Sequence, residues 1–276
     1  MEVVKLADPV EFLERAAPVL ADEARHNLIL GLAATLRDDP ALYDEQQLWL
    51  VLEGEVVGAA LRTPPYNLVL GGGSNEAFEA LAREVGELPG AVGVVPEIDV
   101  FVAAYERVRG VRSKPEVEQG IYALDTVVPP AMPPGGPRTA TAADRGLLVR
   151  WWGEFGVEAL GALEQDEEQN GRNVDHRLGT PGNGIALWEV DGEPVSVAGY
   201  GSPTPTGVRI GPVYTPPEHR GHGYASALTA HVSAEQLAAG RDFCFLYTDL
   251  ANPTSNKIYV EIGYSRVADA IQYAFV

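Results

Sequence analysis

The sequence predicts an α+β protein with two domains. A segment rich in proline and glycine, residues 127–137, lies near the middle of the chain and can sustain neither a helix nor a central strand. Each half contains two apolar runs joined by a glycine turn, at 48–60 and at 187–198, which is typical of a β-hairpin. Apolar residues at helical spacing, such as Leu228 and Val232, follow these strands.

The Pro/Gly segment fixes the expected domain boundaries. At 276 residues the chain is long enough for two domains. We expect a first domain at 1–126, a linker at 127–137 and a second domain at 138–276.

In the first half, strand and helix patterns alternate. The expected elements are a strand at 1–8, a helix at 9–20, a hairpin at 48–60, a strand at 66–70, a helix at 75–82 and a strand at 120–124.

The second half repeats this alternation and shares short likenesses with the first, at its hairpin and at its last strand. The expected elements are a strand at 185–190, a strand at 195–198, a strand end at 213–215, a helix from 224, a strand at 241–248, a helix at 255–262 ended by Gly263, and a strand at 270–275. A tandem repeat of one fold explains the likenesses, although two unrelated α+β domains give similar patterns.

A glycine loop between the strand end at 213–215 and the next helix is the most informative feature. Gly221 and Gly223 carry no Cβ, so the backbone there can take a positive φ and approach a ligand closely. The free N–H groups and the positive dipole end of the following helix would face an anion. The loop lacks the Gly-Lys-Ser/Thr of a P-loop and the third glycine of a dinucleotide fingerprint.

Two motifs in this half resemble those of the GNAT superfamily, the acyl-CoA-dependent N-acetyltransferases. Arg220–Ala225 is similar to the Arg/Gln-x-x-Gly-x-Gly/Ala motif. Asn252–Tyr264 is similar to the pattern Asn-x-x-Ser-x-x-x-Tyr-x-x-x-Gly-Phe/Tyr, and it follows at the expected distance. The resemblance implies two GNAT-like domains, each with a mixed, mostly antiparallel central sheet flanked by helices.

The resemblance also implies which residues bind acetyl-CoA. Backbone groups of the strand end would run beside the pantetheine arm, loop amides would hold the pyrophosphate, and two asparagines would add polar contacts. These residues are Val213, Tyr214 and Thr215 in the strand end, Arg220, Gly221, His222, Gly223, Tyr224 and Ala225 in the loop, and Asn252 and Asn256 after the next strand.

Tyr259 is the expected catalytic residue, because the resemblance places its phenol near the coenzyme A sulfur. Amine attack on a thioester needs a proton donor for the departing sulfur, and a neutral phenol supplies one. The alternative is a core tyrosine whose hydroxyl simply finds a partner. Glu189, on the strand expected at 185–190, is the candidate general base, and a solvated strand face is the alternative for it.

The first half departs from the GNAT motifs. Gly71–Ser74 precedes a helix, but no Arg or Gln leads a Gly-x-Gly run, and Glu76 and Glu79 would repel an anion. We therefore expect a degenerate domain that shapes the acceptor cleft or pairs subunits as a homodimer.

Charge and composition limit the partners. Lys and Arg total 20 against 39 Asp and Glu, a net charge of -19, which argues against a nucleic-acid ligand. An acidic run at 164–168, after a helix that carries Glu154 and Glu158, is either a solvated face or an attraction for a cationic amine. The histidines have no metal-ligand spacing, so no metal is expected.

One cysteine, Cys244, rules out an internal disulfide, and no apolar run is long enough to span a bilayer. With no secretory signal pattern at the start, we expect a cytoplasmic protein.

The function expected from the sequence is acetyl transfer from acetyl-CoA to a primary amine of a small molecule or peptide, by direct attack in a ternary complex. The alternative is a non-catalytic acyl-CoA sensor or regulatory protein. The acceptor itself has no signature in the sequence.

Overall fold

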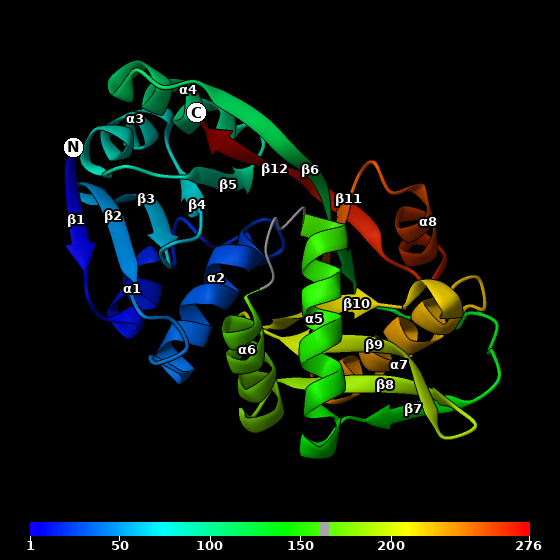
Figure 1. Cartoon of the computed structure of the whole chain (residues 1–276). Coiled ribbons are helices and arrows are strands. Elements are labelled where there is room, and N and C mark those ends of the chain that lie inside the picture. The colour runs from blue at the N-terminus through cyan, green and yellow to red at the C-terminus, as the bar shows by residue number, and fades with distance from the viewer. Residues whose placement is uncertain (161–165) are drawn as a thin grey trace. The chain divides into compact units, whose positions relative to one another are not determined.

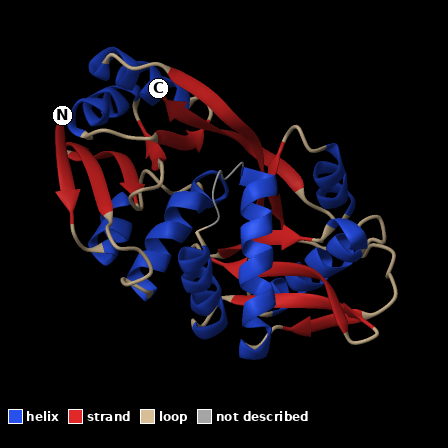
Figure 2. Cartoon of the chain, in the orientation of Figure 1, coloured by secondary structure: helices blue, strands red, loops and turns tan. Residues whose placement is uncertain are grey.

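The computed structural model is a mixed α+β chain that describes residues 1–160 and 166–276 (Figure 1, Figure 2). Contacts between residues divide it into two compact units. The first comprises residues 1–121, 249–251 and 266–276, and the second comprises 122–248 and 252–265. The predicted fold class is confirmed.

The first unit contains a sheet in the order β1-β2-β3-β4-β5-β12, antiparallel except for the parallel pair β4–β5. Its elements are β1 (Glu2–Leu6), α1 (Pro9–Ala16), α2 (Glu23–Asp38), β2 (Gln47–Glu53), β3 (Glu55–Arg62), β4 (Leu68–Gly73), α3 (Asn75–Glu84), β5 (Gly90–Val94), α4 (Glu97–Arg109), β6 (Ser113–Leu124), whose last residues begin the second unit, and β12 (Ser265–Phe275).

Strand alternation gives this sheet two cores. Leu48 and Leu50 of β2 pack in one cluster with residues of α1 and α2, and the intervening Trp49 and Val51 pack in another with residues of α3 and α4. This is the period of two that the hairpin pattern predicted, with both faces covered by helices.

The last strand, β12, belongs to the sheet of the first unit, which corrects the predicted domain boundary. Ile271 pairs with Gly93 and Tyr273 with Ala91 in an antiparallel ladder, and the Tyr273 hydroxyl donates to Asp99 at 2.9 Å. The sequence assigned these residues to the second domain because they follow it in the chain. Backbone pairing with β5 places residues 266–276 in the first unit instead.

The second unit contains a sheet in the order β11-β10-β9-β8-β7, antiparallel except for the parallel pair β10–β11. Its elements are β7 (Gly136–Thr139), a 3-10 turn η1 (Ala142–Asp144), α5 (Arg145–Leu160), α6 (Glu167–Gly179), β8 (Gly184–Val190), β9 (Glu193–Gly201), β10 (Gly207–Tyr214), a 3-10 turn η2 (Pro217–His219), α7 (Tyr224–Ala238), β11 (Phe243–Asp249) and α8 (Pro253–Glu261).

Successive residues along a strand of this sheet again point to opposite faces. Leu187 and Tyr214 pack with residues of α5 and α6, and Ala186 and Val208 pack with residues of α7 and α8. The two units therefore share an arrangement: a hairpin, then a strand that runs parallel to its neighbour and leads into a helix.

The Pro/Gly segment is not a free linker, which corrects the second boundary prediction. The Val128 N–H donates to the Ile262 carbonyl at 2.9 Å, and the fully buried Trp188 donates its indole N–H to the Pro134 carbonyl at 2.9 Å. Strand β7 begins at Gly136, inside the predicted linker. Composition excluded a helix here correctly, but these tertiary hydrogen bonds fix the segment to the second unit.

Candidate functional site

The site is built where β10 separates from β11. The two strands pair only at the start of β10, where Gly207 to Arg209 face Phe243 to Phe245. On its other side β10 stays paired with β9 as far as Tyr214. Within the described residues, the β11-facing backbone groups of Val213 therefore have no strand partner and can accept a ligand.

The glycine loop after β10 has the backbone geometry that the sequence predicted. Gly221 and Gly223 have φ of 82° and 84°, which favours glycine over any residue with a Cβ. Gly223 caps α7 without a side-chain hydrogen bond, and the first turn of α7 has no acidic residue. A Cβ built on either glycine would meet nothing within 4 Å, so the loop faces open space.

The amides of this loop are available to an anion. Among the described residues, no backbone acceptor pairs with the N–H groups from Gly221 to Ser226, whereas the Ala227 N–H donates to the Gly223 carbonyl. The unpaired groups gather at the positive end of a helix of 15 residues, where an anion is stabilised.

Arg220 has partners within the protein. Its Nε donates to the Thr215 carbonyl at 2.8 Å, its Nη2 pairs with Glu158 of α5 at 2.6 Å, and its guanidinium lies 5.9 Å from the centre of the Tyr214 ring. The side chain therefore ties the loop to α5, a contact that the motif alone did not show.

His222 is also held locally. Its Nδ1 lies 3.2 Å from the His219 carbonyl, which can only accept, so the bond requires a proton on Nδ1. Its ring stacks on Tyr224 with centroids 5.4 Å apart.

Ser196 of β9 holds the end of β10, and sequence reasoning missed it. Its fully buried hydroxyl donates to the Tyr214 carbonyl at 3.2 Å and lies 2.8 Å from the Thr215 hydroxyl. Only the pairing of β9 with β10 brings these residues together, because they are far apart in the chain.

Tyr214 points to the α5 side of the sheet. Its ring meets Trp151 edge-on at 6.3 Å, and burial, with Glu154 nearby, raises the pKa of the phenol to about 12. Its side chain is thus part of the packing on this face of the sheet.

Tyr259 lies on α8 and is 9% exposed. Burial raises the pKa of its phenol to about 12, so the group stays protonated at neutral pH. Its ring contacts Tyr264 edge-on at 6.1 Å, and among the described residues no partner is found for its hydroxyl. This hydroxyl, with no partner in the described part of the chain, is available to a ligand.

The two asparagines begin α8. The Asn252 side chain accepts from the Ser255 N–H at 3.1 Å and is the helix N-cap. The Asn256 N–H donates to the Asn252 carbonyl at 3.2 Å. Asn252 thus has a structural task that accounts for its presence.

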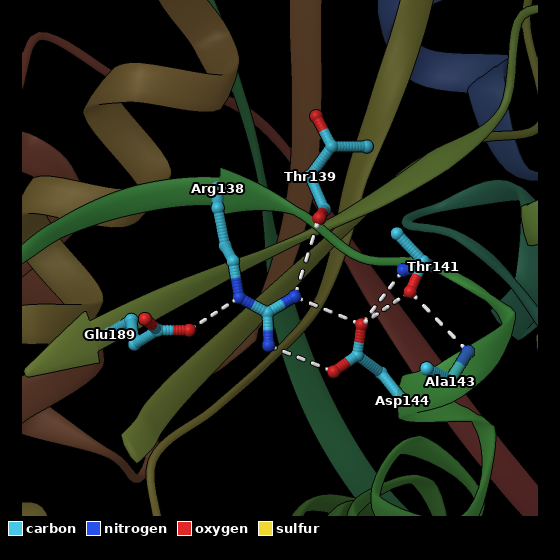
Figure 3. A network of polar contacts seen from close by, with 6 residues as sticks. All are labelled: Arg138, Thr139, Thr141, Ala143, Asp144 and Glu189. Carbon is cyan, nitrogen blue, oxygen red and sulfur yellow. Dashed lines mark hydrogen bonds and ion pairs between the residues drawn. The ribbon is translucent and has the colours of Figure 1, made fainter. Parts of the chain in front are cut away.

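Glu189 is engaged in an ion-pair network (Figure 3). Arg138 of β7 donates from Nε to Glu189 at 2.5 Å, and from its two terminal nitrogens to Asp144 at 2.8 and 2.9 Å. The arginine lowers the pKa of Asp144 to about 2. The Glu189 carboxylate is thus one partner in a charge-assisted network with Arg138, a structural task that accounts for its presence.

The predicted acidic run is only partly described, since Glu164 and Gln165 lie outside the described residues. Asp166 is the N-cap of α6, accepting from the Gln169 N–H at 2.9 Å. Within the described part of the chain, no three His, Cys, Asp or Glu side chains form a group that could hold a metal ion.

The matching junction in the first unit is closed. A Cβ on Gly71 would lie 2.9 Å from Leu20 Cδ2, and one on Gly72 would meet the Val19 carbonyl oxygen and His26. Ser74 caps α3 by accepting from the Ala77 N–H at 3.1 Å. Side chains, a backbone carbonyl and a helix cap fill the space beside this junction.

Comparison with known proteins gives a family match within the second half of the chain. Residues 148–264 match the model of the acetyltransferase (GNAT) family. The second unit belongs to the GNAT superfamily. GNAT enzymes generally use acetyl-CoA as the acyl donor, and they act on amines of small molecules or peptides. Among curated protein sequences, none matches this chain.

Solved structures share the fold over the whole length. A GNAT acetyltransferase from Colwellia psychrerythraea is 14% identical, with a TM-score of 0.62 and 100% of both chains covered. A Drosophila protein is 15% identical, with a TM-score of 0.70, covering 99% of this chain and 98% of its own. A tandem GNAT protein from the clavulanic acid biosynthesis pathway is 16% identical, with a TM-score of 0.59 and coverage of 99% and 97%. At these identities the likeness shows the fold alone.

None of the helices in the described residues combines the length and the apolar character needed to cross a membrane.

Proposed function

We propose that the second unit binds acetyl-CoA and transfers its acetyl group to a primary amine. The observation that carries the proposal is the open glycine loop on the N-terminus of α7, beside the unpaired end of β10. Amides from Gly221 to Ala225 hold the pyrophosphate, and the backbone of Val213 to Thr215 bonds the pantetheine arm. Asn256, on α8, adds a polar contact to acetyl-CoA.

Tyr259 donates the proton that the leaving sulfur needs. The acceptor nitrogen forms a bond to the carbonyl carbon, the carbon–sulfur bond breaks, and the phenol proton passes to the thiolate. The proton lost by the nitrogen restores the phenol through solvent. A phenol pKa of about 12 supports this role, because the donor stays protonated until sulfur leaves.

The experiment that tests this function removes only the phenol hydroxyl of Tyr259, the proposed proton donor. Tyr259→Phe should lower kcat by about a hundredfold, the low end for a general acid, and leave the calorimetric Kd for acetyl-CoA unchanged. Tyr264→Phe, which loses a buried hydroxyl that bonds Ser233 at 2.8 Å, is the matched control and should lower stability instead. An unchanged rate in Tyr259→Phe would assign the tyrosine to packing.

A second function, a non-catalytic acyl-CoA sensor, is favoured by one observation. The Glu189 carboxylate, the predicted general base, is engaged by Arg138. If wild-type protein binds acetyl-CoA and releases no thiol with a broad panel of amines, the sensor is the correct function.

A further inference from the structure

The pairing of Arg220 with Glu158 lies at the edge of the proposed site. Arg220 directly precedes the glycine loop, and Glu158 lies in the last turns of α5. Three contacts fix the guanidinium: the Thr215 carbonyl at 2.8 Å, the Glu158 carboxylate at 2.6 Å and the Tyr214 ring at 5.9 Å. Two of these partners lie at the end of β10, where the loop begins.

We propose that Glu158 and Arg220 form a clamp that sets the geometry of the glycine loop, so that Arg220 positions the loop instead of binding the diphosphate directly. The inference rests on the proposed function and concerns the same site. It makes Glu158, on another element far away in sequence, a positioning residue for cofactor binding.

The loop needs such a clamp for a physical reason. Gly221 and Gly223 give the backbone its freedom, and α7 lacks a side-chain cap, so the loop has few restraints of its own. Helix α5 is a firm anchor because Trp151, 4% exposed, packs its ring against Tyr214. A loop held in its binding geometry before the ligand arrives loses less entropy on binding.

The contacts of Arg220 also distinguish this role from a phosphate contact. A direct phosphate ligand needs a positive charge near the amides, which lysine would supply as well. A clamp needs the guanidinium fork, because one side chain must reach a carbonyl and a carboxylate at once. The lysine variant therefore separates the two roles.

The experiment is isothermal titration of the full-length protein with coenzyme A in a double-mutant cycle. Glu158→Gln and Arg220→Gln should each weaken binding by about fivefold, the upper range for an exposed ion pair, and the double variant should be no weaker than either. Arg220→Lys should lose as much as Arg220→Gln. The proposal is overturned if the lysine variant keeps wild-type affinity, if the two effects add, or if Glu158→Gln is unchanged or tighter.

A matched ion pair on the same helix serves as control. Arg145 of α5 pairs with Asp175 at 2.7 Å, with side chains 49% and 54% exposed, similar to the 43% and 52% of Arg220 and Glu158. Arg145→Gln and Asp175→Asn should leave the Kd unchanged. If the wild type gives no heat with coenzyme A, the proposed function is wrong. If the wild type binds coenzyme A and Glu158→Gln has the same Kd, only the clamp proposal is wrong.

Discussion

The two strand-to-helix junctions of this protein have similar topology, but the space beside the glycines is filled in the first unit and open in the second. In the first unit, Gly71 to Gly73 lead from β4 into α3, and Val19, Leu20 and His26 occupy the space beside them. In the second unit, Gly221 to Gly223 lead into α7, and nothing lies within 4 Å of where a Cβ would be on Gly221 or Gly223. We therefore expect a ligand only at the junction that the protein leaves open.

The capping residues of the two helices sharpen this difference. Ser74 satisfies an amide of α3 with its own side chain, and Glu76 adds a negative charge to the first turn. Gly223 leaves the amides of α7 free. The glycines of the first unit serve close packing, and we propose that those of the second serve ligand access.

The largest expected effect tests the packing role. Gly72→Ala would place a Cβ far inside contact distance of the Val19 carbonyl oxygen, a backbone atom that cannot move aside cheaply. We expect a loss of about 3 kcal/mol of unfolding free energy, as for severe overpacking, measured by urea titration. Gly86→Ala, where a Cβ meets nothing within 4 Å, is the control in the same unit. Equal stability of the Gly72 and Gly86 variants would contradict a filled junction.

The second effect tests the access role. Gly223→Ala costs about 1 kcal/mol of backbone strain, and its Cβ would project into the open space where we propose that the anion binds. We expect the affinity for coenzyme A to fall about thirtyfold, close to 2 kcal/mol, in isothermal titration. The control is Gly240→Ala. Gly240, just after the far end of α7, also has a positive φ and open space around it, so this variant should leave the affinity for coenzyme A unchanged.

The smallest expected effect is a loss of unfolding free energy at acidic pH, caused by His26 beside Gly72 in the first unit. His26 is 9% exposed, both of its ring nitrogens lack a hydrogen-bond partner within the described residues, and burial lowers its pKa below 6.5. Asp22 and Glu97 oppose this shift and Arg25 adds to it. Because the unfolded chain binds a proton more readily, stability should be full above pH 6.5 and fall as the pH drops below it.

The measurement is the unfolding free energy at pH 7.5 and pH 5.5. The wild type should lose more stability between these values than His26→Leu, which has no imidazole to charge. A pH dependence that is the same in both proteins would show that His26 is not buried as a neutral group.

Much of the fold could be predicted from local pattern. The hairpins at 48–60 and 187–198, the helix from Tyr224 and the final strand all form where the sequence indicated, because alternation and helical spacing are local properties. The domain assignment of 266–276 was wrong, since a strand pattern does not say which strand it pairs with.

The sequence by itself determined the glycine loop, since glycine takes the positive φ found at 221 and 223 without steric strain. It also determined the strand and helix on either side. Only the tertiary structure decided that one glycine junction is open and the other filled, that Arg138 engages Glu189, and that Glu158 meets Arg220. The physical reason is that space and charge around a site come from residues remote in sequence. Local pattern cannot place them.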